Sequence, residues 1–361
     1  MTEPHTRNLD VLKLHRELVS FPSLSHEEAD VASHLEAHFR DHGLEPTRLG
    51  DNIVVSIGEG ENVLLLNSHL DVVPPSSDHP YPPFEPTSVD GQVFGRGTVD
   101  AKGSVAAMAT AICNLHGKGY VPENGKVMGA FTVCEETGGV DNGLEEIISR
   151  LPKPHAALIG EPTNMQPCVA QKGLLILRAD ASGKSAHAAR AIEGENAIMK
   201  MGRDLQTLSA FRFDRIHPYL GETTLSVTMI DGGVARNMIP DACSIYIDIR
   251  STPEYDHDEI AEILDRVLES EVQIHSKRFV PTDTPFDSHV VKACTRAHPG
   301  STPFGSPTMS DWIHVKDIST VKIGPGDSRL SHTANEHIAE SELEESCAIY
   351  ESIIKHYFDQ H

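Results

Sequence analysis

The stretch KVMGAFTVCEETGG, residues 126–139, joins a continuous apolar run to two adjacent carboxylates, Glu135 and Glu136. Continuous apolar runs of this length, bounded by turn formers, are typical of strands that are covered on both faces of a parallel sheet. Two like charges side by side repel, and nearby buried surface adds a desolvation cost. The stretch therefore predicts an α/β sheet, with positive charge close to the two glutamates.

Other apolar runs have the same character: NIVVSIG (52–58), NVLLLNSHLD (62–71), HAALIG (155–160) and STVKIGPGDS (319–328). Segments with helical spacing separate or follow them: VLKLHRELVSFPS (11–23), EEADVASHLEAHFRDHG (27–43), AKGSVAAMATAICNLHGKG (101–119) and SELEESCAIYESIIKHYF (341–358). The second of these is expected to follow a cap at Ser25. We therefore expect an α/β domain with a central, mostly parallel sheet flanked by helices.

The middle of the chain has a different pattern, in which strand-like and helical segments alternate compactly. They are LLILRADASG (174–183), NAIMKMGRDLQTLSAF (196–211), TTLSVTMIDGG (223–233), CSIYIDIRST (243–252) and YDHDEIAEILDRVLESEV (255–272). The pattern of the first part resumes afterwards. We expect one catalytic domain in two pieces, residues 1–174 and 282–361, with an α+β lid or dimerisation domain, residues 175–281, inserted between them.

Length and composition bound the function. A chain of 361 residues suits two domains, or one large domain with an insertion. Lys and Arg total 30 against 53 for Asp and Glu, a net charge of -23, which makes nucleic acid and anionic membranes poor partners. The six cysteines are scattered and are expected to be reduced, mostly buried thiols. The polar start MTEPHTRNLD and the lack of a membrane-length apolar run predict a cytoplasmic protein.

Carboxylates and histidines follow the predicted strands or precede a helix: His69, Asp71, Asp100, Glu135, Glu136, Glu161 and His332. In open α/β sheets the carboxyl ends of the strands meet at one crevice, so these residues are expected to converge. Imidazoles and carboxylates together suit zinc, cobalt or manganese. A metal pair needs a bridging carboxylate and two further ligands per ion, and the set is large enough for both. One glutamate of the pair can then bind metal while its neighbour moves a proton.

Each of these residues also has a structural alternative. A histidine at a strand end is often a hydrogen-bonded structural residue, and two glutamates can form a solvated turn. Asp71 and Asp100 have the alternative of capping a turn or helix, and Asp100 can do both. Cys134, beside the glutamates, is most simply a small core residue. The ordered series of residues favours the metal site.

The series resembles the M20 family of dinuclear zinc hydrolases along the whole chain. The motifs are HLD (69–71), GRGTVDAKG (95–103), EETGG (135–139), GEPT (160–163) and SRLSHTANEHI (328–338). The resemblance implies two divalent ions per chain, zinc with cobalt as a substitute. His69 and Glu161 would hold one ion, Glu136 and His332 the other, and Asp100 would bridge them. Asp71 would orient His69, and Glu135 would be the general base.

The resemblance also assigns residues to the lid. GKSAHA (183–188) suggests that His187 reaches the site of the partner in a homodimer formed through the lid, with an ordinary polar lid residue as the alternative. Asn237 and Arg250 would bind the substrate carboxylate, and a surface ion pair is the alternative for Arg250. Two motifs depart from the usual pattern, DAKGS, which begins at Asp100, and SPTMSD, which ends at Asp311, and neither departure changes an implied ligand.

The implied activity is amide hydrolysis on a small N-acyl amino acid. Glu161, where Asp is the alternative, accompanies deacylases and carboxypeptidases in this family, and the segment 322–338 looks most like the biosynthetic branch. The leading expectation is an N-acetylornithine deacetylase of arginine biosynthesis. Alternatives are succinyl-diaminopimelate desuccinylase, deacylation of citrulline or lysine derivatives, a carboxypeptidase or dipeptidase, and a non-catalytic protein that binds acyl amino acids.

Overall fold

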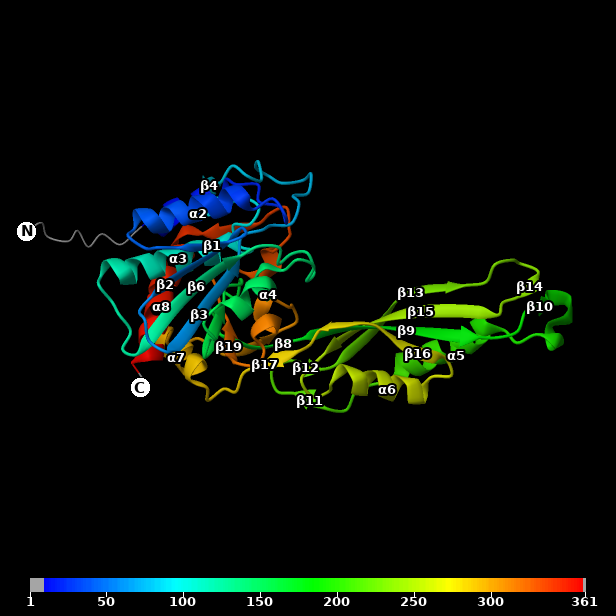
Figure 1. Cartoon of the computed structure of the whole chain (residues 1–361). Coiled ribbons are helices and arrows are strands. Elements are labelled where there is room, and N and C mark those ends of the chain that lie inside the picture. Colours follow the sequence, from blue (N-terminus) through cyan, green and yellow to red (C-terminus); the bar gives the residue numbers. More distant parts are fainter. Residues whose placement is uncertain (1–9, 360–361) are drawn as a thin grey trace, which may run out of the picture. The chain divides into compact units, whose positions relative to one another are not determined.

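The computed structural model describes residues 10–359, which form two compact units (Figure 1). The first comprises the chain to Val169, Thr284–Phe304 and the chain from Ser310, and the second comprises Ala170–Asp283 and Gly305–Met309. The expected insert, 175–281, lies within the second unit. Gly305–Met309 was expected in the catalytic domain but is grouped with the second unit, where the Lys172 backbone N–H donates to Ser306 O at 3.0 Å.

The central sheet has the strand order β1-β2-β6-β3-β7-β19-β8-β17. Its strands are β1 (Thr47–Leu49), β2 (Asn52–Ile57), β6 (Gly125–Thr132), β3 (Asn62–His69), β7 (Ala156–Ile159), β19 (Ser319–Lys322), β8 (Cys168–Gln171) and β17 (Thr282–Asp283), with β18 (Phe304–Ser306) beside β8. The middle strands β6, β3, β7 and β19 run parallel, while the outer pairings are antiparallel. The predicted fold class, α/β with a mostly parallel central sheet, is confirmed.

Both faces of this sheet are covered, which explains the continuous apolar runs. Along β3, Leu64 and Leu66 pack into one core, and Val63 and Leu65 into another. Fully burying each leucine stabilises the fold by about 1.5–3 kcal/mol. The first core is shared with helices α1 (Val11–Val19), α2 (Ala29–Asp41), α3 (Lys102–Gly117), α7 (His289–Ala297) and α8 (Glu340–Phe358). The second is closed by α4 (Gly143–Ile147) and η3 (Asp311–Val315), with η1 (Ile148–Arg150) following α4.

The predicted helix cap at Ser25 is wrong, as is the alternative of a cap at Asp100, and both residues turn toward the candidate site instead. Helix α2 starts from Glu28, which makes no side-chain cap, and Ser25 Oγ donates to Asp71 Oδ2 at 2.7 Å. Helix α3 starts from Ala101, so Asp100 does not cap it. A separate small sheet consists of β4 (Thr87–Val89), β5 (Gln92–Phe94) and β20 (His337–Ala339). The short helix η4 (Ser328–Leu330) precedes β20 in the chain.

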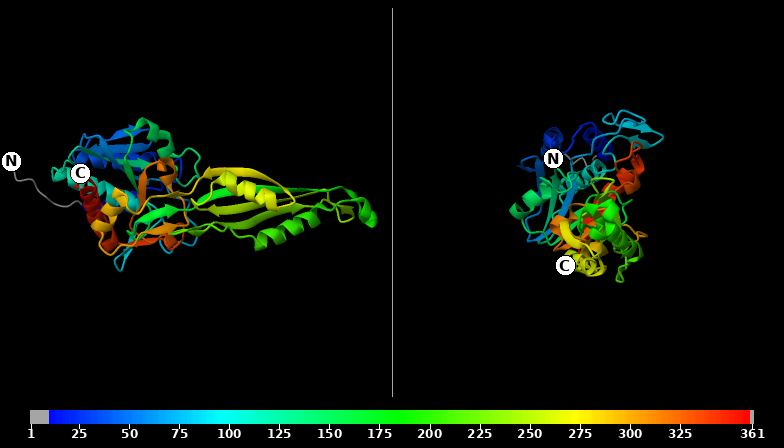
Figure 2. Two further views of the ribbon diagram at one scale, coloured as in Figure 1. Left: turned by 90° about the horizontal axis from the view of Figure 1, so that it is seen from below. Right: turned by 90° about the vertical axis from the view of Figure 1, so that its right-hand side faces the viewer.

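The second unit is an antiparallel sheet of order β13-β15-β9-β16, covered on one face by two helices. The strands are β13 (Thr224–Gly232), β15 (Ala242–Ser251), β9 (Gly173–Ser182) and β16 (Glu271–Phe279), and the helices are α5 (Ala197–Ala210) and α6 (His257–Val267). Alternate residues of β9 and β15 are buried in the core that the sheet shares with the helices. Both helices lie against the same face of the sheet (Figure 2). Shorter elements are β10 (Ala186–His187), η2 (Ala188–Glu193), β11 (Ile216–His217), β12 (Gly221–Glu222) and β14 (Met238–Ile239).

The cysteines match the expectation, since all six are buried thiols. Across residues 10–359, no helix is long and apolar enough to cross a membrane.

Candidate metal centre

Neighbouring parallel strands deliver several predicted ligands to one edge of the central sheet. His69 is the last residue of β3 and pairs in register with Thr132, the last residue of β6. Glu135 and Glu136 follow β6, and Glu161 follows β7, the strand on the other side of β3. Because these strands are parallel, their carboxyl ends place the side chains at the same edge, as expected from the sequence.

Asp100 and His332 reach this edge from distant segments. His69 Nε2 lies 3.2 Å from Asp100 Oδ1 and 3.8 Å from Glu161 Oε1. His332 Nε2 lies 2.9 Å from Glu136 Oε1 and 3.4 Å from Asp100 Oδ2. Asp100 therefore turns one oxygen toward each histidine, which is the geometry of a carboxylate shared between two ions.

The donor atoms form two overlapping groups of three. His69, Asp100 and Glu161 offer donors within 4.8 Å of one another, and so do Asp100, Glu136 and His332. Asp100 is common to both groups. The structure thus brings the five predicted ligands together in the two groups that the family resemblance implies.

The carboxylates of the cluster repel one another, and nearby positive charge would stabilise their ionised forms. Burial and the nearby negative charge of Asp100 raise the pKa of Glu161 to about 8. Enclosure by the protein and the charge of Glu161 raise the pKa of Glu135 well above its usual value. Hydrogen bonds to Asp100 and Glu136 raise the pKa of His332 to about 10, so both histidines tend to carry protons that offset the carboxylates.

These residues fit a pair of divalent metal ions. Crowded carboxylates within reach of two imidazole nitrogens form a site that two dications would neutralise. Oxygen and imidazole donors suit zinc, cobalt and manganese, whereas magnesium prefers oxygen ligands and water. In one group His69 and Glu161, and in the other Glu136 and His332, would hold the ions, with Asp100 between them.

Asp71 has a wider role than orienting His69. The His69 Nδ1–H donates to the Asp71 carbonyl oxygen at 2.9 Å and lies 3.4 Å from Asp71 Oδ1. The Asp71 carboxylate also accepts from the backbone N–H groups of Glu135 and Glu136, each at 3.1 Å, and from Ser25 Oγ. This fully buried side chain therefore fixes both the imidazole and the turn that carries the two glutamates.

A buried ion pair that the sequence reasoning missed supports the other side of the site. Arg96 Nη1 donates to Glu336 Oε2 at 2.5 Å, and both residues are buried. Glu336 Oε1 accepts from the backbone N–H groups of Val99 and Asp100 at 2.9 and 3.1 Å. Arg96 Nη2 also donates to the carbonyl oxygen of His332 at 3.4 Å. The only sequence signal was that Arg96 and Glu336 lie inside the quoted motifs.

The three predicted lid residues lie in the second unit. His187 is exposed on β10, and its Nδ1 accepts from the Ala189 backbone N–H at 3.1 Å. The carbonyl oxygen of Asn237 accepts from the Ala188 N–H, so His187 and Asn237 occupy one local structure. Arg250 Nε donates to Asp248 at 2.9 Å, which is the ion pair that had been its alternative. Their roles toward substrate stay predictions.

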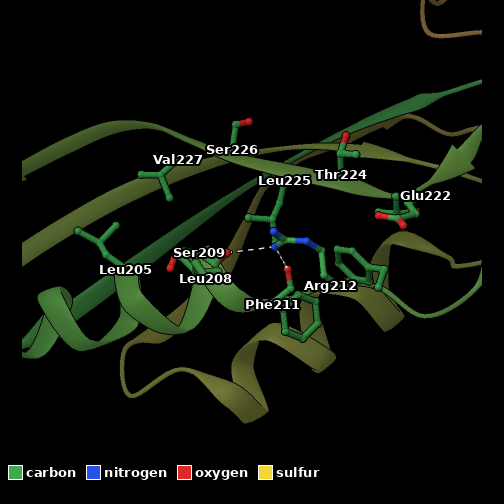
Figure 3. A pocket seen from close by; sticks show the side chains of 12 residues that line it. Leu205, Leu208, Ser209, Phe211, Arg212, Glu222, Thr224, Leu225, Ser226 and Val227 are labelled. Carbon is green, nitrogen blue, oxygen red and sulfur yellow. Dashed lines mark hydrogen bonds between the residues drawn. The ribbon is translucent and has the colours of Figure 1, made fainter.

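The second unit also has a cavity of about 470 Å³ between α5 and β13, shown in Figure 3. Leu205 and Leu208 of α5 face Leu225 and Val227 of β13, and Arg212 Nη1 donates to the carbonyl oxygens of Ser209 and Phe211. The predicted site residues of the lid are not among those that line it.

The chain is similar to known proteins along most of its length. The family model described as peptidase family M20/M25/M40 matches residues 65–356. Succinyl-diaminopimelate desuccinylase of Halorhodospira halophila is 26% identical over 96% of this chain and 97% of that protein. Acetylornithine deacetylase of Myxococcus xanthus is 26% identical over 94% of this chain and 92% of that protein.

Solved structures share the fold. A tripeptidase from Staphylococcus aureus has a TM-score of 0.78 at 21% identity and covers 98% of this chain and 99% of its own. An M20 family metallo-carboxypeptidase from Sulfolobus solfataricus has a TM-score of 0.71 at 18% identity and covers 97% of this chain and 100% of its own.

Proposed function

This chain belongs to peptidase family M20/M25/M40, and from that premise we propose that it removes the acetyl group of N-acetylornithine with two zinc ions per chain. Membership makes the chain a metal-dependent hydrolase, and the names of its relatives support an activity on amides. The observation that carries the proposal is the pair of ligand groups that share Asp100.

Glu135 is the proposed base. Its carboxylate, with His69 and Glu136, belongs to a third group of donors within 4.8 Å of one another, so it lies beside both proposed ion positions. Two bound divalent ions would lower the pKa of a water molecule and polarise the amide carbonyl. Glu135 then accepts the proton of the attacking water and returns it to the departing amine. Asp71 holds the Glu135 backbone in place for both transfers.

The charge of the residues predicted to bind substrate supports an N-acetyl rather than an N-succinyl substrate. A succinyl group carries a carboxylate in addition to that of the amino acid, whereas an acetyl group is neutral. Among the residues predicted to bind substrate, Arg250 is the cation, and its Nε and Nη2 already donate to Asp248. A partly neutralised guanidinium favours a substrate with fewer carboxylates.

Desuccinylation is the second candidate, because several of the related proteins are named succinyl-diaminopimelate desuccinylases. The test is amine release from N-acetylornithine, N-acetylcitrulline, N-acetyl-lysine, N-succinyl-diaminopimelate and simple dipeptides, with zinc or cobalt added to the purified protein. We expect the highest kcat/KM with N-acetylornithine. Higher turnover of the succinyl compound or of dipeptides would replace the proposal, and binding without turnover of any compound would favour a non-catalytic protein.

We also propose a homodimer formed through the second unit. Strand β13 is an edge strand, and an unpaired edge is a template for a second copy. Met229 and Ile230 on β13 are 64% and 58% exposed, and Met199 on α5 is 64% exposed. An exposed apolar edge of this kind fits a two-fold contact.

Mixing two inactive variants tests whether His187 acts across such a dimer. Chains with His187→Ala and chains with Glu135→Ala should restore part of the activity when they form heterodimers. The matched control mixes Glu135→Ala chains with Glu136→Ala chains, which share one site and should stay inactive. A strictly monomeric enzyme with full activity would rule out the proposal.

A further inference from the structure

A cluster of nitrogen and sulfur donors lies between helices α2 and α3 and shares no residue with the candidate metal centre. His38 and His42 are one helical turn apart at the end of α2, and Cys113 is on α3. One donor atom from each of the three lies within 4.8 Å of the other two. Side chains four positions apart share a helix face, so both imidazoles lie on one side of α2.

The hydrogen bonding of His42 leaves one ring nitrogen ready to bind a metal. The His42 Nδ1–H donates to the carbonyl oxygen of His38 at 2.7 Å. A carbonyl oxygen only accepts, so the proton of the neutral ring lies on Nδ1 and Nε2 keeps its lone pair. Metal-binding histidines commonly have this arrangement, in which a backbone carbonyl fixes the tautomer and the ring orientation.

His38 has a buried ring nitrogen that makes no hydrogen bond. Its Nε2 atom is buried and has no hydrogen-bond partner, which costs about 1–3 kcal/mol for a polar group removed from water. Burial and the neighbouring His42 lower the pKa of His38 to about 4, so the ring is neutral near pH 7. The two imidazole rings are 4.4 Å apart between centroids. A cation between them would satisfy the unpaired nitrogen.

Cys113 supplies the third donor. Its side chain is 2% exposed, and burial raises the pKa of the thiol to about 12, so the sulfur carries its proton at neutral pH. Binding of a divalent ion forms a metal–sulfur bond, breaks the S–H bond and releases one proton to water. Water would supply the fourth ligand, or the exposed His116, three residues further along α3, after a movement of its side chain. The His116 ring lies near the residue after His42, since a Cβ at Gly43 would be 3.5 Å from its Nε2.

We propose that His38, His42 and Cys113 form a third metal site, for a single borderline-soft divalent ion of the zinc class. Two imidazoles and a thiolate exclude calcium and magnesium, which take oxygen ligands. Ligand atoms around tetrahedral zinc lie roughly 3.5 Å apart, so small side-chain rotations from the present spacing close the site. The bound ion would link the end of α2 to α3.

Cobalt(II) distinguishes this site from the proposed dinuclear centre. The five ligands of the dinuclear centre offer only nitrogen and oxygen, whereas the proposed third site contains sulfur. Metal-free full-length protein titrated with cobalt should therefore show a near-ultraviolet sulfur-to-cobalt charge-transfer band. The total should rise to three ions per chain, and zinc should abolish the band by displacement.

Variants assign the band to particular residues. Cys113→Ser should remove it and reduce the bound metal by one ion per chain. His42→Gln should weaken cobalt binding by about 10- to 100-fold or more, because loss of a direct ligand costs at least as much as loss of its supporting contact. Cys134→Ser is the matched control, since Cys134 lies beside Glu135 and contacts His26 rather than His38, and it should keep the band.

Either of two results would overturn the proposal: a wild-type protein without the band, or a band lost in Cys134→Ser and kept in Cys113→Ser. Should Cys113→Ser fail to fold, His42→Gln carries the test, because His42 is half-buried just past the helix end. An unchanged cobalt affinity in that variant would then refute the site. Zinc should also raise the Tm of Glu136→Ala protein more than that of Glu136→Ala/His42→Gln protein, because both variants keep the group His69, Asp100 and Glu161 and only the first keeps His42.

Discussion

Replacing Asp71 by asparagine should disturb the turn that carries Glu135 and Glu136. The wild-type carboxylate accepts from two backbone N–H groups at 3.1 Å and from Ser25 Oγ at 2.7 Å. An asparagine retains one acceptor oxygen and places an NH₂ group where the other oxygen was, so at least one N–H donor faces another donor. A hydrogen bond to a charged group contributes about 1.5–3 kcal/mol, and we expect Asp71→Asn to lower the free energy of unfolding by about 3 kcal/mol.

The same change should slow catalysis. A displacement of about 1 Å in a catalytic group costs roughly 100-fold in rate, so kcat should fall by about that factor in Asp71→Asn protein that is still folded. Urea denaturation, metal content and steady-state kinetics measure the three effects. Asp90→Asn is the matched control, because Asp90 is exposed on a turn. Stability within 0.5 kcal/mol of wild type and kcat within about twofold would refute the reasoning.

Four further results are expected. Glu135→Gln should keep the bound metal and lower kcat by about 10²- to 10⁴-fold, whereas Glu136→Ala should lose metal. Elemental analysis and kinetics separate the two variants. Loss of metal in Glu135→Gln but not in Glu136→Ala would contradict the roles of base and ligand assigned to them. Chelation should abolish amide hydrolysis and added zinc or cobalt should restore it, so activity in protein proven free of metal would exclude the mechanism. Arg96→Ala should cost about 3–5 kcal/mol in urea denaturation because Glu336 is left buried and uncompensated, and Arg96→Met/Glu336→Gln should recover part of it. Burial lowers the pKa of His15 to about 4, so the unfolded state takes up the proton first and His15 alone should lower the stability by about 2–3 kcal/mol from pH 7 to about pH 4.5. His38 has a similarly lowered pKa, so His15→Gln should reduce the pH dependence by that amount and leave the contribution of His38.

The fold was predictable because its signal is local. A strand buried on both faces must be apolar throughout, so β3 and β6 were visible as runs, and small residues marked α3 as a helix buried nearly all round. The ends of those runs also identified His69 and the glutamate pair. These inferences needed no knowledge of how distant segments meet, beyond the rule that parallel strands end at one edge.

The supporting contacts were not predictable, because they depend on distant backbone groups. Serine is a common residue at helix N-caps, but the Ser25 hydroxyl instead donates to Asp71. Asp100 precedes a helix and still does not cap it, since its two oxygens face His69 and His332. Nothing in the local sequence around Glu336 indicates that it accepts from the backbone of Asp100. Such contacts are decided by tertiary structure.

The position of β19 has a consequence for the order in which the protein matures on the ribosome. This strand occupies the middle of the sheet between β7 and β8, although it is the last strand of that sheet to be synthesised. Until residues 319–322 leave the ribosome, β7 has an open edge, and His332 and Glu336, further along the chain, cannot yet reach the folded part. From the completion of β7 until β19 emerges, a nascent chain therefore lacks the proposed ligand His332 and has an unpaired strand edge, the stage at which chaperone protection matters most. Truncation just before residue 319 should yield an aggregating product rather than a smaller working enzyme.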